Sequence, residues 1–469
     1  MRLRTAALIA LLPVGLAALA LPATAANGAG RRFGPAIHID LENKTGEPSI
    51  AVAPDGTEYV VAPDGPGLRL PGEAFASGSG GSLIWRSTDH GRSWHALGTY
   101  DGPTGGGDSD IAVAPDGTLY ASGLSYVACS TVSRSTDRGS SWLAMPVGGC
   151  GREPLMNDRQ WTATFGNSVV YTAIGDTVDS QIDLVRSVVD SPVVVPSTTM
   201  QLSTEADYQW PGTVEVDQHS GNVYTAWNTT GDPNNCDKSP GADKCLPAQA
   251  STKTPDLIEI SALPATASNA PVPRVVASRP FDTFDSFVAV AVDKAGAVYV
   301  VWSERHAATR GTWTMLARSA DGGQHWSAPV RVNRAPRTTT FPWVTAGDDG
   351  RIAVSYYGTS AAGYSPQTVD DTSTWRVYSS YSTNGGRSFQ EYPTTGVMDR
   401  GAICTSGTGC SAGGRNLLDF FETAMDGNGC LVTAFADNTV APKSAAVISY
   451  VRQTAGPGLL AGRACSVPG

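Results

Sequence analysis

Charged side chains stand directly ahead of several short apolar segments in the first half of the chain. They are Glu47, Asp108, Asp110 and the adjacent pair Asp158-Arg159. Carboxylates can act as general acids, general bases or nucleophiles, and an arginine binds anionic groups of a ligand. We therefore select Asp110 and Asp158 as candidate catalytic residues, and Glu47, Asp108 and Arg159 as candidate substrate-binding residues.

Aromatic residues take the corresponding places in the later part of the chain. Trp210 and Trp343 lie at such segment starts, as Trp161 does earlier, and Glu422 stands at another. An aromatic face can stack on a sugar ring while polar groups orient the ligand. Glu422 is therefore the third candidate catalytic residue, and the three tryptophans complete the candidate substrate-binding set. The sequence leaves an alternative equally open, in which the aromatics pack in the core and the acids cap exposed strand ends.

Two of these groups have structural alternatives of their own. The Asp158-Arg159 pair is more readily explained as a salt bridge between structural units than as a ligand contact. Asp108 and Asp110, two residues apart on the glycine-rich loop that starts at Gly105, could bind calcium, although their spacing matches no EF-hand. We therefore expect no metal and no other cofactor, with calcium on this loop as the alternative.

All of these residues fall at one place in an internal repeat. A typical copy has a short apolar strand, a turn rich in Asp, Asn and Gly, and a second strand that carries an aromatic residue. This pattern predicts a β-hairpin. Seven copies are present, and they begin at Glu47, Asp110, Trp161, Gly212, Phe287, Trp343 and Phe421.

A second motif, SxDxGxxW, lies between these hairpins. Its Asp carboxylate and Ser hydroxyl can accept hydrogen bonds from turn amides, its Gly adopts a positive φ, and its Trp packs back onto the sheet. The motif therefore predicts a structural turn rather than a catalytic or calcium-binding site. The four copies are Ser87–Trp94, Ser135–Trp142, Ser319–Trp326 and the variant Ser382–Phe389, which has Asn384 in place of Asp.

The two kinds of hairpin together predict an all-β fold, a β-propeller of four-stranded antiparallel blades. Blade two would run from Asp110 through the turn at Asp137, and blade six from Trp343 through the turn at Asn384. Seven hairpins favour seven blades, with six as the alternative if the first or last hairpin only closes the ring. Propellers bind ligands at the mouth of the central channel, where the innermost strands begin, and the candidate residues lie at those strand starts.

The hairpins and SxDxGxxW turns resemble the Asp-box (BNR-repeat) sialidase-like β-propeller superfamily over nearly the whole mature chain. The resemblance implies a glycan-acting propeller whose active members use three arginines, a Tyr nucleophile activated by a Glu, and an Asp acid/base. The early Arg-Ile-Pro motif of that family is absent, because the chain reads Arg32-Phe-Gly-Pro-Ala-Ile37 here, so no role transfers residue by residue. Residues of the right types are Arg159, Arg305, Arg376, Arg400, Arg415, Tyr356 and Glu422.

The N-terminus has the pattern of a signal peptide. Arg2 and Arg4 precede an apolar stretch from Ala6 to Ala20, and Ala23-Thr-Ala25 offers a small-residue cleavage site. The apolar stretch is shorter than the roughly 20 residues of a membrane-spanning helix. We expect residues 1–26 to be removed and residues 27–469 to form a single propeller domain that is secreted and extracellular.

The cysteine pattern agrees with export. Eight cysteines are present, none in a CxxC pair, which favours disulfides over a zinc site. Pairing by proximity would give Cys129–Cys150, Cys236–Cys245, Cys404–Cys410 and Cys430–Cys465.

The charge balance limits the classes of partner. A net charge of −10 disfavours nucleic acid and anionic membranes, and it makes an anionic substrate depend on local arginines. We expect a monomer with a carbohydrate or glycoconjugate ligand. The first hypothesis is a sialidase-like exo-glycosidase, of the exo-α-sialidase type, acting on extracellular glycans. The alternative is a non-catalytic propeller that binds a glycan or a protein.

Overall fold

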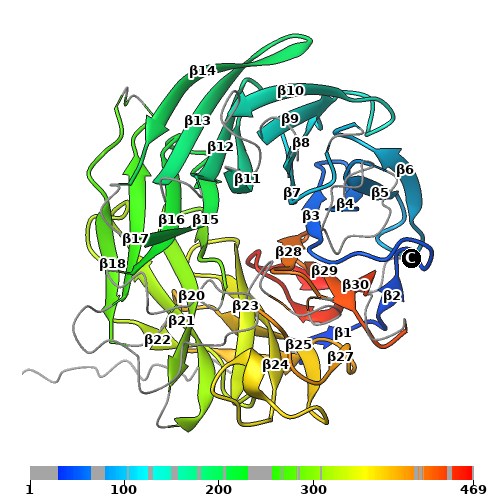
Figure 1. Cartoon of the computed structure of the whole chain (residues 1–469), viewed down its shortest axis with the longest axis vertical. Helices are drawn as coiled ribbons and strands as arrows, with labels where there is room; N and C mark the ends of the chain where they lie inside the picture. The colour runs from blue at the N-terminus through cyan, green and yellow to red at the C-terminus, as the bar shows by residue number, and fades with distance from the viewer. Residues whose placement is uncertain are drawn as a thin grey trace, which may run out of the picture.

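The strands of the computed structural model form seven antiparallel sheets arranged around a common centre (Figure 1). Each sheet contains a path of four strands, and the seven-blade prediction is confirmed while the six-blade alternative is wrong. The structure describes residues 30–64, 80–102, 105–124, 130–148, 157–176, 181–203, 208–230, 256–265, 267, 269–280, 283, 286–306, 309–405, 410, 415, 417–440 and 446–466.

Four consecutive strands make up each of the first four blades, in order from the centre outwards. Blade 1 is β3 (Ser49–Val52), β4 (Glu58–Ala62), β5 (Leu83–Ser87) and β6 (His95–Thr99). Blade 2 is β7 (Ser109–Val113), β8 (Leu119–Leu124), β9 (Ser130–Ser135) and β10 (Leu143–Gly148). Blade 3 is β11 (Asn157–Phe165), β12 (Val169–Asp176), β13 (Gln181–Asp190) and β14 (Val193–Gln201). Blade 4 is β15 (Tyr208–Val216), β16 (Val223–Thr230), β17 (Asp256–Leu263) and β18 (Arg274–Arg279).

The remaining blades follow the same plan with additions at the end of the chain. Blade 5 is β19 (Ala289–Val292), β20 (Val298–His306), β21 (Gly311–Ser319) and β22 (Val330–Arg331). Blade 6 is β23 (Thr338–Ala346), β24 (Ile352–Thr359), β25 (Thr374–Ser382) and β26 (Gln390–Pro393), with β27 (Asp399–Arg400) also on β25 and the 3-10 turn η2 (Pro366–Thr368) between β24 and β25. Blade 7 is β28 (Glu422–Met425), β29 (Leu431–Asp437), β30 (Val447–Pro457) and β1 (Arg32–Phe33).

The two ends of the described chain meet in blade 7. Strand β1 pairs with β30 as the outer strand, and β2 (Ile37–His38) and β31 (Ala464–Cys465) pair with the same strand (Figure 1). The first strands of the chain therefore complete the sheet that the last strands form. This pairing closes the ring of blades.

The hydrophobic core lies between neighbouring blades, and an aromatic residue of each second strand contributes to it. Tyr59, Tyr120, Tyr171, Tyr224 and Tyr299 occupy this place in the first five blades, and all are buried. Alternate residues of a strand point to opposite faces, so the apolar residues on both faces of each blade meet those of the adjacent blades. The core is consequently spread between blades around the ring.

The SxDxG turns lie between the third and fourth strands of blades 1, 2, 5 and 6, where the motif predicts them. In the first turn Ser87 Oγ donates to Asp89 Oδ1 at 2.8 Å and accepts from Gly91 N at 2.9 Å. Ser93 N donates to Asp89 Oδ1 at 2.9 Å. The carboxylate is thus used within the turn. These turns lie at the end of the blades opposite the channel mouth, because the third strand runs away from it.

Two of the four expected disulfides lie within the described residues. Cys404 pairs with Cys410, and Cys430 pairs with Cys465, as proximity predicts. The expected pairs Cys129–Cys150 and Cys236–Cys245 lie outside the described residues, as does the expected signal peptide. Where the chain is described, it forms no helix that is long and apolar enough to cross a membrane.

Candidate functional site

The hairpin registers align the starts of the seven inner strands. In each inner hairpin, one residue of the first strand pairs across the turn and closes it, as Ala53 does with Thr57. The residues four positions before these closing residues are equivalent, and we call them the second ring: Ser49, Asp110, Trp161, Thr213, Ala289, Trp343 and Glu422. The residues two positions earlier form the mouth ring: Glu47, Asp108, Arg159, Pro211, Phe287, Phe341 and Phe420. All nine sequence-predicted site residues therefore lie in or beside these rings, with Asp158 adjacent to Arg159 and Trp210 adjacent to Pro211.

Arg159 lies at the centre of the mouth ring. From blade 3 its guanidinium reaches Glu47 of blade 1 at 3.0 Å and Asp108 of blade 2 at 3.4 Å. It also lies 4.5 Å from the ring centroids of Phe287 and Phe420, which belong to blades 5 and 7. A side chain that contacts four other blades must extend to the axis of the propeller. Arg159 is 2 % exposed and thus closes the channel mouth.

Glu47 is held between two arginines. Arg415 Nη2 lies 3.7 Å from the same Glu47 Oε1 that Arg159 contacts, and Asp419 N donates to this oxygen at 2.8 Å. Arg415 in turn forms a two-pronged ion pair with the carboxylate of Asp419. Arg415, Asp419 and Asp108 are partly exposed, with side-chain exposures of 19, 13 and 13 %. These three side chains form the accessible charged part of the site.

The electrostatics of this cluster are set by burial and by an excess of acid. Two guanidinium groups face three carboxylates, Glu47, Asp108 and Asp419. Burial raises the pKa of Glu47 well above its usual value, and the charges of Asp108 and Asp419 raise it further while Arg159 and Arg415 oppose the shift. A proton on Glu47 would bring the cluster to neutrality, which is the direction that a buried site favours.

Local backbone strain accompanies the mouth ring. Glu47, Arg159 and Phe341 have φ values of 50°, 68° and 53°, in the left-handed region. For residues other than Gly this conformation costs on the order of 1–2 kcal/mol, and such strain is concentrated at functional sites. The fold therefore maintains an unfavourable backbone geometry at three of the seven ring positions.

The second ring contains a carboxylate pair joined by a hydroxyl. Ser49 Oγ lies 2.8 Å from Asp110 Oδ1 and 2.7 Å from Glu422 Oε2. Asp110 also accepts Ile111 N at 2.8 Å and Thr162 N at 2.6 Å. Burial raises the pKa of both acids, and in Glu422 the charge of Asp110 adds to the shift. This pair lies one layer below the mouth and links blades 1, 2, 3 and 7.

The candidate tryptophans divide into a buried and a partly exposed set. Trp161 is 1 % exposed and packs edge-on against Phe287 and Phe420 at 5.6 and 5.0 Å, which is the core role that the sequence left open. Trp210 and Trp343 remain partly exposed. Trp210 stacks on Phe287 with centroids 5.6 Å apart, which fixes its ring plane.

Other candidates lie apart from this cluster. Tyr356 is fully buried in β24, and its hydroxyl donates to Glu391 of the outer strand β26 at 2.5 Å. Burial raises its pKa well above the usual value, whereas a nucleophilic phenol needs the opposite shift. Arg376 donates to Thr395 O on the outer part of blade 6, and Arg400 lies in β27 on the same blade. The side chain of Asp158 lies outside the described residues.

The glycine loop before β7 holds its acids in protein contacts. Asp108 faces Arg159, and Asp110 contacts Ser49. Within the described residues no group of three or more His, Cys, Asp or Glu side chains is arranged to hold a metal ion. The loop itself is fixed by Asp101, which accepts Ser82 N at 2.6 Å and Gly106 N at 3.2 Å.

Sequence reasoning did not identify Ser49 or the convergence of Arg415 and Asp419 on Glu47. Ser49 could have been found by aligning the second ring, where it occupies the same position as Asp110 and Glu422. The Arg415–Asp419 pair has the i, i+4 spacing of an ion pair, but it lies far from Glu47 in the sequence. The described residues thus bring two partly exposed carboxylates and one partly exposed arginine together at the channel mouth.

Comparisons with known proteins support the fold. No protein-family model matches the sequence, and no curated protein sequence matches it. An ulvan lyase of polysaccharide lyase family PL25, solved with bound -[GlcA(1-4)Rha3S]-, is similar with a TM-score of 0.52 and 10 % identity over 90 % of this chain and 96 % of that one. The polysaccharide lyase Uly1 has a TM-score of 0.50 and 8 % identity over 94 % of both chains. An α-L-arabinanase of Penicillium chrysogenum complexed with arabinobiose has a TM-score of 0.46 and 12 % identity over 89 % of this chain and 98 % of that one. At these identities the likeness to the two lyases, whose TM-scores are 0.50 and 0.52, shows a shared fold alone.

Proposed function

We propose that this protein is a secreted, glycan-acting β-propeller whose ligand binds at the channel mouth. The observation that carries the proposal is the position of Arg159 on the propeller axis, where it holds Glu47 and Asp108 beside the partly exposed Asp419 and Arg415. Such a convergence of buried charge, backbone strain and exposed aromatic faces is typical of a ligand site. The ulvan lyase at a TM-score of 0.52 supports this choice, since it was solved with bound -[GlcA(1-4)Rha3S]-.

The residues of the site take different roles in this proposal. Asp108 and Asp419 contact the sugar and supply the carboxylates that glycosidic bond cleavage requires. Glu47 and Arg159 act as positioning residues, because they are buried and hold the two exposed acids. Trp210 and Trp343 provide stacking faces. Asp158 stays a proposed catalytic residue beside Arg159, and Asp110 and Glu422 are proposed to hold a proton one layer deeper.

The charge balance favours an uncharged sugar over sialic acid. A sialidase directs three arginines at the carboxylate of its substrate, but here Arg159 and Arg415 are already directed at Glu47. An additional anionic group would meet Asp108 and Asp419 as well. We therefore propose a glycosidase for neutral sugars, and a sialoside is retained as a test substrate.

The second candidate function is glycan binding without turnover. It is favoured by the contacts of the accessible acids, since Asp419 is bound to Arg415 and Asp108 to Arg159. An acid fixed in an ion pair is less able to exchange a proton with a substrate.

The test uses the mature protein with chromogenic glycosides of neutral sugars and of sialic acid, and with polysaccharides that include ulvan. Reducing ends report hydrolysis, and absorbance of unsaturated sugars reports elimination. Asp419→Asn is compared with the control Asp348→Asn. Asp348 is a carboxylate in the β23–β24 turn, at the end of the blades opposite the channel mouth, and it forms an ion pair with Lys294.

The proposal expects turnover of a neutral sugar that falls at least 100-fold in Asp419→Asn and is unchanged in Asp348→Asn. Binding to a glycan that requires Trp343, with no product from any substrate, would establish the non-catalytic function. If no glycan is cleaved or bound, the glycan-acting proposal is wrong.

A further inference from the structure

A polar cavity of about 360 Å³ lies where blade 1 meets blade 7. Its lining includes Asp89, His90 and Arg92 from the first SxDxG turn, and Asn428 and Arg452 from blade 7. The SxDxG turn and the β28–β29 turn both lie at the end of the blades opposite the channel mouth. The cavity is therefore separate from the site described above.

The equivalent position between blades 1 and 2 is bridged by an ion pair. There Arg138, at the position of His90 in its own SxDxG turn, forms an ion pair with Asp55 at 3.0 Å and donates to Thr57 Oγ1 at 2.5 Å. Asp55 occupies the position in the β3–β4 turn that Asn428 has in the β28–β29 turn. The blade 7–1 junction thus has a His and an Asn in the cavity lining where the blade 1–2 junction has an ion pair.

Arg452 differs from the arginines at equivalent positions in other blades. Register places it opposite Val432, as Arg86 lies opposite Tyr59 in blade 1. Arg86 is partly exposed and donates to Arg138 O. Because Val432 is smaller than a tyrosine, Arg452 can turn inwards, and it is only 7 % exposed.

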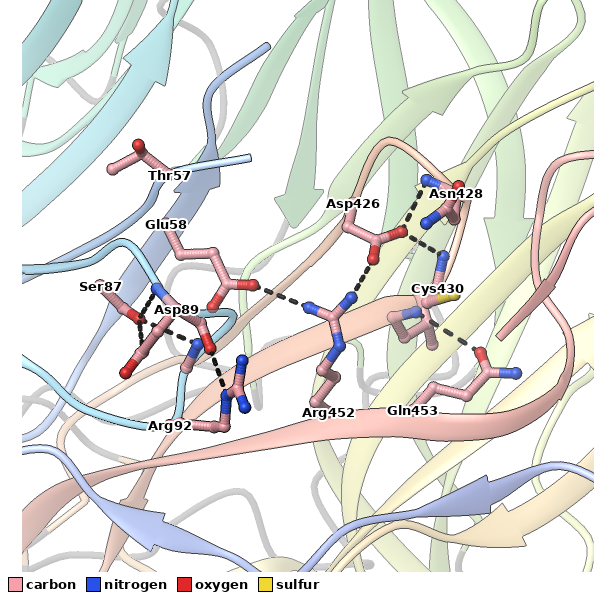
Figure 2. Close-up of polar contacts among 12 residues, drawn as sticks. Thr57, Glu58, Ser87, Asp89, Arg92, Asp426, Asn428, Cys430, Arg452 and Gln453 are labelled. Atoms are coloured by element: carbon pink, nitrogen blue, oxygen red, sulfur yellow. Dashed lines mark hydrogen bonds and ion pairs between the residues drawn. The ribbon is translucent and has the colours of Figure 1, made fainter. Parts of the chain in front are cut away.

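Figure 2 shows this guanidinium between Glu58 of blade 1 and Asp426 of blade 7. Arg452 Nη1 lies 2.9 Å from Glu58 Oε1, and the buried hydroxyl of Tyr450 interacts with both Glu58 and Arg452. These side chains form a buried polar cluster, and Arg452 is the member of it that lines the cavity.

The lining favours a ligand that both donates and accepts hydrogen bonds. The carboxylates of Asp89 and Asp426 already accept from turn amides and hydroxyls. Arg452 is paired with Glu58 and Asp426, and Arg92 stands beside Asp89 (Figure 2). The three carboxylates outnumber the two arginines, which disfavours a free anion, and no three described His, Cys, Asp or Glu side chains are arranged to hold a metal ion. Hydroxyl groups match this mixture of arginine, amide and carboxylate groups. The cavity volume is at the small end of ligand pockets, about 300–1,000 Å³.

We propose that this cavity is a second binding site for a neutral, polyhydroxylated ligand the size of one sugar ring. Hydroxyl groups of the sugar bind Arg452, Arg92 and Asn428 at the blade 7–1 junction. A glycan bound here occupies the face opposite the channel mouth, so the protein can hold a polymer at a place separate from the mouth.

The test uses the mature protein and saturation-transfer NMR with the methyl glycosides of glucose, galactose, rhamnose, xylose and arabinose. The key variant is His90→Arg/Asn428→Asp. It introduces into the cavity the ion pair that Arg138 and Asp55 form at the blade 1–2 junction. Trp343→Ala removes a stacking face at the mouth and leaves the cavity unchanged. Thermal unfolding confirms that each variant is folded.

We expect at least one glycoside to bind Trp343→Ala, with a Kd raised at least tenfold by adding His90→Arg/Asn428→Asp. Equal binding with and without the filled cavity would overturn the second site, as would the absence of binding to Trp343→Ala by every glycoside. The proposal for the channel mouth is judged separately, by turnover or binding that requires Trp343 and Asp419.

Discussion

Ser49 Oγ and Glu422 Oε2 lie 2.7 Å apart, and Asp110 Oδ1 lies 2.8 Å from the same hydroxyl oxygen. A serine hydroxyl has one hydrogen, so it can donate to only one of these carboxyl groups. The other group must carry a proton and donate to Ser49. Asp110 accepts two backbone N–H groups and Glu422 accepts one, from Ile50, so hydrogen bonds stabilise the charged form of Asp110 more, and we infer that the proton resides on Glu422.

This assignment predicts different outcomes for two matched substitutions. Glu422→Gln should lower the free energy of unfolding by no more than about 1 kcal/mol, because an amide can replace a protonated carboxyl group as donor to Ser49, and only the 3.2 Å hydrogen bond from Ile50 N is lost. Asp110→Asn should cost about 1–3 kcal/mol, because one oxygen that now accepts a backbone N–H would become an NH₂ group. Urea unfolding measures both. A larger loss in Glu422→Gln than in Asp110→Asn would place the proton on Asp110.

Glu215 in the inner strand β15 predicts a loss of stability as pH rises. The other inner strands have Ala51, Ala112, Ala163, Ala291, Thr345 and Ala424 at this position. Burial raises the pKa of Glu215 to about 7, from 4.5. The native state therefore binds this proton more tightly than the unfolded state, and the stabilisation is lost as pH rises from about 4.5 through 7.

The corresponding measurement is the Tm between about pH 5 and pH 8. We expect the wild-type Tm to fall over this range and Glu215→Gln to fall less, with a higher Tm at the alkaline end. Glu42→Gln, at an exposed carboxylate, should follow the wild type. Parallel curves for Glu215→Gln and the wild type would contradict the assigned shift.

Removing the guanidinium on the propeller axis should destabilise the fold. Arg159→Met leaves Glu47 and Asp108 without their shared cation, and the loss of one partner from a buried pair costs about 3–5 kcal/mol. Glu47→Gln combined with Arg159→Met should recover part of this loss, because it removes the uncompensated charge. Denaturant unfolding of the single and double variants provides the comparison, and additive losses would argue against the coupling.

The two described disulfides offer a matched pair for testing ring closure. Cys430 and Cys465 are 35 residues apart, and Cys404 and Cys410 are 6 apart. Loop entropy predicts that replacing both cysteines of the longer pair with Ala costs about 4 kcal/mol, against about 2 kcal/mol for the shorter pair. Thermal or urea unfolding should rank the two double variants in this order. A reversed order would show that the Cys430–Cys465 bond contributes little to holding blade 7.

The propeller could be predicted because its hairpins are local in sequence. The turn residues near Asp55 and Asp116, and the SxDxG motif, each specify a short element by its own chemistry. The positions of the mouth residues followed from the same alignment. Their contacts did not, because Arg159, Glu47 and Asp419 come from different blades and meet only when the ring is closed.

The roles of the aromatic residues could not be read from the sequence for a related reason. Trp161 and Trp343 occupy equivalent positions in their strands, yet one is buried and the other partly exposed. The difference arises because Arg159 of the same strand, together with Phe287 and Phe420 from other blades, covers Trp161. The exposure of a side chain at a strand start therefore depends on which residues of other blades pack against it near the axis.

The pairing of β1 with β30 has a consequence for the order of assembly. Arg32 is paired with Ala455, so the first strand has no sheet to join until nearly the whole chain has been made. Blades 1 to 6 can form in sequence during synthesis, but the ring stays open until the last hairpin arrives. A chain cut short before β30 would keep β29 and β1 without the strand that both pair with, and such unpaired edges invite association with other chains. We therefore expect chains that end before β30 to be less soluble than complete chains.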